Sequence, residues 1–214
     1  MKDISNVVDL EKVVIKFAGD SGDGMQLTGT QFTDTSALLG NDLATFPDYP
    51  AEIRAPQGTV AGVSGFQIHI GRIDITTPGD IADVLVAMNP AALKANKNFI
   101  KKGGSIIVNI DSFTKRDFDK AGYENSPLDD NSFEGYNIIQ APISKLTRET
   151  LKDSKLDGKS IGRSKNMFAL GIVYWMFNRP MEQTEAFLKK KFSKKPELVE
   201  ANIKVMHAGY NFAD

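Results

Sequence analysis

The stretch VVIKFAGDSGDGMQ, residues 13–26, decides how the rest of this chain is organised. It opens with β-branched and aromatic residues, Val13 to Phe17, which are typical of a strand buried in a parallel sheet. Gly19, Gly22 and Gly24 follow, and glycine allows positive φ and leaves no Cβ in the way of a ligand or another chain. A helix beginning near Met25 would then offer free backbone N–H groups to an anion. The pattern predicts a strand, a glycine elbow at residues 19–24, and a helix.

The glycine spacing of the elbow, G-x-x-G-x-G, leaves two interpretations open. It differs from the G-x-G-x-x-G dinucleotide fingerprint, and the elbow is followed by Met25 and Gln26 rather than the Gly-Lys-Ser/Thr of a P-loop. A purely structural elbow, which lets a helix pack closely on the sheet, therefore stands beside a ligand-binding one. Asp20 and Asp23 would repel a phosphate unless their side chains turn away from it.

Composition bounds the class of protein. With 214 residues, 41% of them hydrophobic, the chain can bury a real core as one large domain or one domain with a small appendage. Its 26 Lys and Arg against 27 Asp and Glu give a net charge of -1, which favours neither nucleic acid nor an anionic membrane as a partner. The absence of cysteine excludes disulfides and cysteine-ligated iron–sulfur clusters or zinc within the chain. Residues 1–12 lack the apolar core of a signal peptide and no stretch resembles a membrane span, so we expect a soluble, cytoplasmic protein.

Strand and helix patterns alternate along the chain. Residues at helical spacing predict helices at 25–39, 143–151, 164–177, 182–192 and 196–208, and Asn89-Pro90 predicts the start of another that runs to Gly103. Strands are predicted at 43–46, 59–71, 84–88, 105–110 and 136–140. The second of these alternates apolar and polar residues, which predicts a half-exposed strand with His69 on its less buried face. Residues 84–110 form a βαβ unit, whose two strands should lie parallel.

These patterns together predict a three-layer α/β domain with a Rossmann-like, mostly parallel sheet and C-terminal helices. We expect a single domain over residues 1–214, with a core of about 12–178 and helical packing of about 179–210.

Three segments are predicted to be loops. Residues 47–58 hold three prolines, which rule out a regular helix or central strand, and we expect an ordered surface loop. Its Glu52 and Arg54 either form a solvated ion pair or shape the loop for a ligand or subunit. Residues 112–135 should be a surface excursion, and the basic stretch 154–163 a solvated loop that could be mobile, with phosphate contact as the lesser alternative.

No catalytic constellation emerges from the residues. There is no cysteine nucleophile and no G-x-S-x-G motif, and His69 and His207 stand alone without companions at metal-ligand spacing. We therefore assign no catalytic residue and no metal site to the chain.

Four segments together resemble the gamma-type domain of 2-oxoacid:ferredoxin oxidoreductases. They are FAGDSGDGMQLTG (17–29), PAEIRAP (50–56), VAMNPAAL (86–93) and KNMFALG (165–171). The resemblance is strongest to the N-terminal part of the fused alpha subunit of 2-oxoglutarate:ferredoxin oxidoreductase. Generic gamma subunits have a sequence similar to G-x-G-G-Q-G at the elbow, whereas this chain has GDSGDG, in which two acids replace neutral residues.

The resemblance implies a complex that decarboxylates a 2-oxoacid on thiamine diphosphate and magnesium, passes electrons through iron–sulfur clusters to ferredoxin, and releases an acyl-CoA. This chain would hold none of these cofactors alone. It would pack against an alpha segment, fused downstream, and a beta subunit, and help to shape the coenzyme A channel. The end of the chain, from Ala208 to Asp214, is expected to join that alpha segment.

The resemblance implies cofactor-binding positions in three places, which are Gly19, Asp20, Ser21, Gly22, Asp23 and Gly24 in the elbow, Glu52 and Arg54 in the proline-rich loop, and Asn166. Two other functions remain open. One is a non-catalytic assembly module that binds no ligand, and a weaker one is a free-standing nucleotide-binding dehydrogenase domain.

Overall fold

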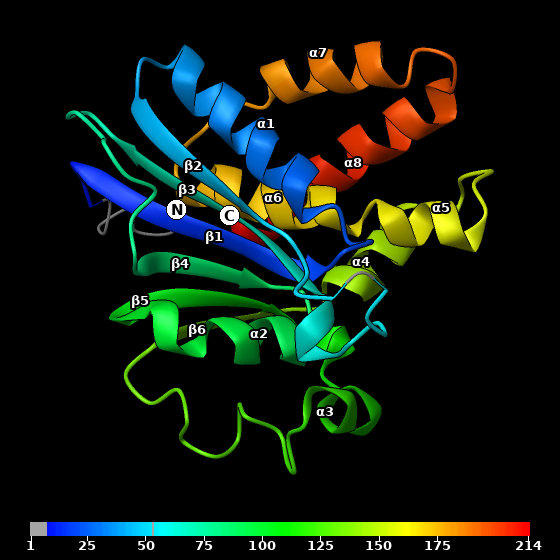
Figure 1. Ribbon diagram of the computed structural model, residues 1–214. Helices are drawn as coiled ribbons and strands as arrows, with labels where there is room; N and C mark the ends of the chain where they lie inside the picture. The colour runs from blue at the N-terminus through cyan, green and yellow to red at the C-terminus, as the bar shows by residue number, and fades with distance from the viewer. Residues whose placement is uncertain (1–7, 53) are drawn as a thin grey trace.

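The computed structural model describes residues 8–52 and 54–214, so the polar lead-in before Val8 and Ile53 of the proline-rich loop lie outside it. A six-stranded sheet in the order β2-β3-β1-β4-β5-β6 forms its centre (Figure 1). The strands are β1 (Lys12–Asp20), β2 (Asp42–Asp48), β3 (Val63–Gly71), β4 (Ala82–Ala87), β5 (Ile100–Asn109) and β6 (Asn137–Ala141).

The sheet is mostly parallel, as predicted, with one reversed strand. β1, β4, β5 and β6 pair in parallel, whereas β3 runs antiparallel to both β1 and β2. β3 is an inner strand with side chains buried on both of its faces, so the expectation of a half-exposed strand is wrong for it. Gln67 is 7% exposed and donates hydrogen bonds to the carbonyls of Pro78 and Gly79, and His69 is only partly exposed.

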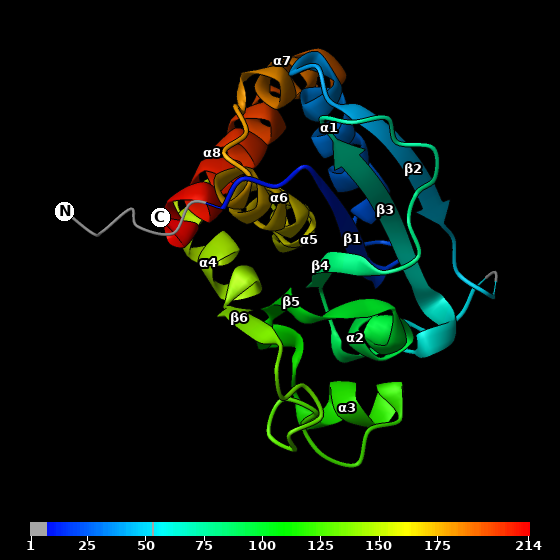
Figure 2. The same cartoon turned by 90° about the vertical axis from the view of Figure 1, so that its left-hand side faces the viewer.

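Helices cover the two faces of the sheet unequally (Figures 1 and 2). One face carries α1 (Met25–Leu38), α4 (Ile143–Thr150), α6 (Lys165–Met176), α7 (Glu182–Lys191) and α8 (Pro196–Ala213), and the other carries α2 (Pro90–Asn96) and α3 (Lys115–Ala121). Successive side chains of a strand point to opposite faces. Phe17 accordingly belongs to the core under α1 and α6, and Ala18 to the core under α2. The three-layer α/β fold is confirmed.

The helix that Asn89 begins is shorter than predicted. The Asn89 side chain accepts a hydrogen bond from the Ala92 N–H at 2.8 Å, so the predicted cap is correct. α2 ends at Asn96, whose side-chain amide donates to the Ala92 carbonyl, and after one 3₁₀ turn β5 begins at Ile100 rather than at Ser105. Gly103 and Gly104 therefore lie inside a strand. The Gly103 φ of 79° is a conformation that glycine adopts without strain.

Two short helices occupy segments that were predicted to be loops. α3 lies within 112–135 and ends at Ala121, where Gly122 caps it with a φ of 72°. α5 (Gly158–Arg163) lies within 154–163, and the Asp157 carboxylate caps it by accepting the N–H groups of Lys159 and Ser160 at 2.9 Å. Both helices are polar and one or two turns long, so they lack the apolar periodicity that identifies longer helices.

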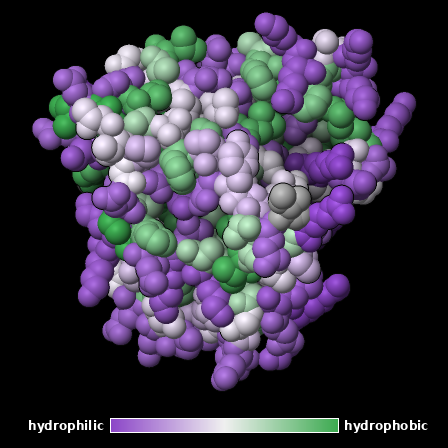
Figure 3. All heavy atoms as spheres, in the orientation of Figure 1, coloured by the Kyte–Doolittle hydropathy of each residue, from purple (hydrophilic) through white to green (hydrophobic). Residues whose placement is uncertain are grey.

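The two apolar helices α6 and α8 pack together unusually closely. A Cβ built on Gly171 of α6 would overlap the carbonyl oxygen of Met206, and one built on Gly209 of α8 would overlap that of Phe168. The absence of side chains at these two positions lets the helix backbones touch, which buries most of α6. In the view of Figure 3 the molecular surface is mainly hydrophilic with hydrophobic residues interspersed. None of the helices in the described ranges is long and apolar enough to cross a membrane.

Candidate functional site

The elbow lies where the sheet reverses its direction of winding. The chain leaves β1 for α1 on one face of the sheet, and leaves β4, the parallel neighbour of β1, for α2 on the other face. The carboxyl ends of β1 and β4 are held together there, since the Met88 N–H donates to the Ala18 carbonyl at 2.9 Å. In open α/β sheets such a switch point is where ligands bind.

Both acidic side chains of the elbow are turned into the protein. The Asp23 carboxylate accepts the Asp20 N–H at 3.1 Å and pairs with the Lys165 ammonium at 2.9 Å. The Asp20 carboxylate accepts the Gly58 N–H at 3.0 Å, which ties the proline-rich loop to the elbow. These contacts hold the elbow together and join it to the proline-rich loop and to α6. Both carboxylates are therefore engaged within the protein rather than directed toward an approaching anion.

Burial raises the pKa of the Asp20 carboxyl above its usual value. The N–H of Gly58 opposes that rise, the nearby charge of Asp23 adds to it, and the amide of Asn89 and the charge of Lys165 oppose it further. Folding thus disfavours the ionised form of the Asp20 carboxyl.

Each glycine of the elbow has a different role. Gly24 adopts a φ of 76° and precedes the first turn of α1, and the Asn166 amide donates to its carbonyl at 3.4 Å. A Cβ on Gly19 would lie 2.8 Å from the Asp23 carboxylate and 3.1 Å from the Met88 Cβ, so glycine permits both the fold of the elbow and the close approach of the two strand ends. Gly22 is exposed, and a Cβ there would meet only the Gln57 amide at 3.7 Å. Gly22 and the exposed Ser21 therefore form the outer surface of the elbow.

The predicted residues of the proline-rich loop are placed differently. Glu52 and Arg54 are exposed, and no ion pair between them is found in the described part of the chain. Arg54 has a positive φ of 107°, which is uncommon for a residue with a side chain. The loop reaches the elbow through Gln57 and Gly58 instead.

The structure thus unites the elbow with Asn166 and adds three residues that sequence reasoning did not assign to the site. These are Gly58, Asn89 and Lys165. Lys165 stands next to Asn166 in a recognised motif, which was the available signal. In the sequence, Gly58 indicated a loop and Asn89 a helix cap. Neither pattern predicted a contact with the elbow, which arises because both residues lie close to Asp20 in the fold.

The donor set of the elbow suits an anion better than a metal. The first turn of α1 has no side-chain cap and no acidic residue, so no capping side chain competes with an anion for its N–H groups. Throughout residues 8–52 and 54–214 no three His, Cys, Asp or Glu side chains gather as metal ligands. His69 contacts the Thr77 carbonyl at 2.8 Å and His207 contacts Glu185 at 2.7 Å, so both histidines have partners within the fold.

A three-layer α/β domain with a glycine elbow at its switch point is the class that this fold and site define. The model of the family "Pyruvate ferredoxin/flavodoxin oxidoreductase" matches residues 14–212. The chain belongs to that family.

Relatives of known name refine the comparison. Over 208 residues the chain is 55% identical to the 2-oxoglutarate oxidoreductase subunit KorA of Mycobacterium tuberculosis. The aligned region covers 96% of this chain and 31% of KorA. A solved 2-oxoglutarate:ferredoxin oxidoreductase from Magnetococcus marinus, with 2-oxoglutarate, coenzyme A and succinyl-CoA bound, superposes with a TM-score of 0.74 at 28% identity. That match covers 96% of this chain and 31% of the other. The chain thus spans about a third of the length of these relatives.

The same fold also occurs as a whole subunit. The gamma subunit of a keto/oxoacid ferredoxin oxidoreductase from Geobacter sulfurreducens superposes with a TM-score of 0.61 at 22% identity, covering 94% of this chain and 98% of that subunit. The likeness in fold therefore extends over almost the entire gamma subunit.

Proposed function

We propose that this chain is the gamma-type part of a 2-oxoacid:ferredoxin oxidoreductase that acts on 2-oxoglutarate. The identity of 55% to KorA, sustained over 96% of the chain, is the observation that carries the proposal. The complex would oxidise the 2-oxoacid with thiamine diphosphate, magnesium and iron–sulfur clusters, transfer electrons to ferredoxin and form the CoA thioester. An alpha segment and a beta subunit, in the cytoplasm, would supply the groups that this chain lacks.

Within that complex, the outer surface of the elbow is proposed to line the channel through which coenzyme A reaches the reaction centre. The uncapped first turn of α1 and the exposed Ser21 and Gly22 suit an anionic ligand in charge and access. Asp20 and Asp23 are held inward by Gly58 and Lys165, so they hinder such a ligand less than their charges alone would suggest.

A non-catalytic assembly role is the second candidate, and the same inward contacts favour it. Asp20, Asp23 and Asn166 join the elbow to the proline-rich loop and to α6. An elbow with this architectural role would need no ligand.

The variant Gly22→Val distinguishes the two candidates. A side chain at this exposed position points toward the outer surface of the elbow and meets only the Gln57 amide, so we expect the fold to survive. The measurement is 2-oxoglutarate-dependent reduction of a viologen dye by the full-length protein with its partner subunit, as a function of coenzyme A concentration. If the elbow lines the channel, the KM for coenzyme A rises about tenfold or more, since a misplaced side chain opposes binding.

Gly158→Val is the matched control, because Gly158 is also exposed and no atom lies within 4 Å of its added Cβ. An unchanged KM for coenzyme A in both variants would favour the assembly role. Failure of the wild-type complex to oxidise 2-oxoglutarate would contradict the proposed activity itself.

A further inference from the structure

The sheet face that carries α2 leaves its β2 edge uncovered. α2 packs over β1, β3 and β4, while a groove of about 690 Å³ opens between β2 and the end of α2. Lys16 and Gln67 of the sheet form its floor, and β2, the 3₁₀ turn at Val60, Ile81 before β4, and Phe99 form its walls. We call this feature the β2 groove.

The walls of the β2 groove are apolar and solvent-exposed. They hold Phe46, Tyr49, Val60, Ile81 and Phe99, which are between 41% and 69% exposed. These side chains come from separate segments of the chain, so the fold itself gathers them in one place. Contiguous exposed patches of large apolar side chains mark interaction sites, whereas single exposed residues of this kind do not.

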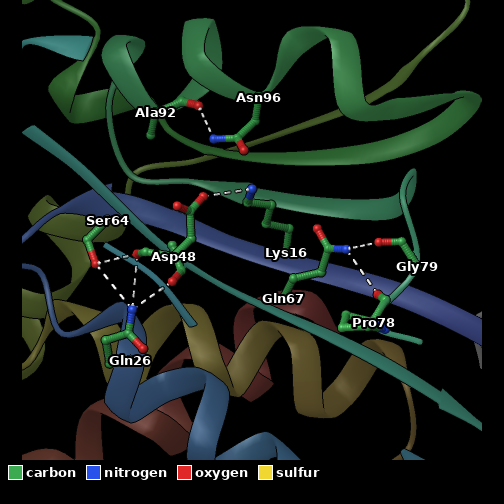
Figure 4. A network of polar contacts seen from close by, with 10 residues as sticks. Lys16, Gln26, Asp48, Ser64, Gln67, Pro78, Gly79, Ala92 and Asn96 are labelled. Atoms are coloured by element: carbon green, nitrogen blue, oxygen red, sulfur yellow. Dashed lines mark hydrogen bonds and ion pairs between the residues drawn. The ribbon is translucent and has the colours of Figure 1, made fainter. Parts of the chain in front are cut away.

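The polar side chains at the floor and at the end of α2 already have partners within the protein (Figure 4). The Lys16 ammonium pairs with the Asp48 carboxylate at 3.1 Å, and the Gln67 amide donates to the Pro78 carbonyl at 3.0 Å. The Asn96 amide donates to the Ala92 carbonyl at 2.8 Å. A small polar ligand depends on a few free, convergent donors and acceptors to fix its orientation. The satisfied floor and apolar walls favour a protein surface as the occupant.

The charge at the rim indicates the chemistry of that protein. Asp80 is exposed beside Ile81, and the Asp48 side chain is 42% exposed. Lys16 is the only cationic side chain among the described residues that line the groove, and it is buried against Asp48. Since Lys16 neutralises Asp48, the net negative charge of the rim comes from Asp80, which suits a partner that carries Lys or Arg next to its apolar face.

We propose that the β2 groove is the docking site for a segment of the same polypeptide that lies outside these 214 residues. That segment presents an apolar face to Phe46, Val60 and Phe99, and a Lys or Arg to Asp80. The relatives offer ample chain for it, since this chain spans only 31% of KorA. The inference rests on the proposed function, because it requires that the larger complex exists.

Photo-crosslinking in the intact complex tests the proposal. A benzoylphenylalanine replaces Phe99 in the full-length protein, which is purified with its partner subunit, irradiated and analysed by peptide mass spectrometry. We expect a crosslink to a peptide of the same polypeptide outside residues 1–214. The matched control places the probe at Leu38, which is 68% exposed at the end of α1 and away from the groove, and it should not label that peptide.

Four results would overturn the proposal. They are a crosslink to the separate partner subunit, a crosslink to another copy of this domain, a small molecule that co-purifies in the groove and blocks labelling, and the absence of any crosslink from Phe99. Turnover of 2-oxoglutarate by the same preparation is measured in parallel. A fully active complex with any of these results would leave the proposed function standing and the docking site wrong.

Charge reversal tests the chemistry of the partner. Asp80→Arg should lower the crosslink yield from Phe99 about two- to fivefold at low salt, because it places like charges together at an exposed position. Asp74→Arg makes the same change at an exposed residue outside the groove and should have no effect. Circular dichroism checks that both variants remain folded, and equal yields in the two variants would contradict the assignment of a cationic partner.

Discussion

Asp20 is an elbow residue that makes a structural hydrogen bond although its ionised form is disfavoured by burial. Its carboxylate anchors the proline-rich loop through Gly58, yet burial raises its pKa. A carboxyl whose pKa is raised on folding contributes stability only while it is protonated. That contribution is complete below the unfolded pKa, near 3.8, and is lost as the pH rises through the higher folded value.

Asp20→Asn should therefore become more stable relative to wild type as the pH rises from about 4 toward 7. The asparagine oxygen can still accept the Gly58 N–H, while the buried charge is gone. Urea unfolding of both proteins across this pH range measures the difference. Asp74→Asn, at an exposed carboxyl, is the control and should show no such trend. Parallel curves for wild type and Asp20→Asn would mean that the Asp20 charge carries no cost.

The packing of α6 on α8 depends on two glycines rather than on large side chains. Gly171 and Gly209 let each helix contact the backbone of the other, and α6 is thereby buried among the remaining helices. Lys165 and Asn166, at the first turn of α6, are the residues that hold the elbow. A change in the packing of α6 on α8 would therefore also displace Lys165 and Asn166 relative to the elbow.

Gly171→Ala should destabilise the fold by about 1–3 kcal/mol or more, because its methyl group would overlap the Met206 carbonyl and force the helices apart. Thermal or urea unfolding measures the loss. Gly162→Ala in α5 is the matched control, since no atom lies within 4 Å of its added Cβ. Replacing a helical glycine by alanine without a steric clash leaves the free energy of unfolding unchanged or raises it by up to about 1 kcal/mol. Similar stabilities for both variants would show that α6 and α8 have room to adjust.

Considered as a whole molecule, this chain has the fold of its family, and we expect the redox chemistry to lie on other parts of the complex. Carbanion chemistry needs an electron sink such as thiamine, and one-electron transfer needs a redox centre, and ordinary side chains supply neither. The chain has no cysteine to hold a cluster. Gly22-Asp23-Gly24 is the one near match to the Gly-Asp-Gly of thiamine sites, but Asp23 pairs with Lys165 and no Asn-Asn follows about 30 residues later.

We expect the 214-residue chain alone to show no 2-oxoglutarate-dependent reduction of a viologen dye, even with thiamine diphosphate, magnesium and coenzyme A present. Activity should appear when the alpha and beta parts are supplied, and that reconstituted complex is the positive control. Calorimetry measures thiamine diphosphate binding to the isolated chain independently. Stoichiometric binding there, or turnover by the chain alone, would place the chemistry on this polypeptide.

The sequence by itself predicted the strand–elbow–helix start, the α/β class and the cap at Asn89, because each depends on local patterns of glycine, apolar periodicity and capping. The resemblance in the four motifs likewise pointed to the family. Tertiary structure decided the direction of β3 and the burial of Gln67, since alternation of side chains does not reveal which neighbours cover a strand. It also decided the environment of the elbow. Lys165 reaches Asp23 only because the topology places the start of α6 beside the end of β1, and no local pattern specifies a contact between segments so far apart in sequence.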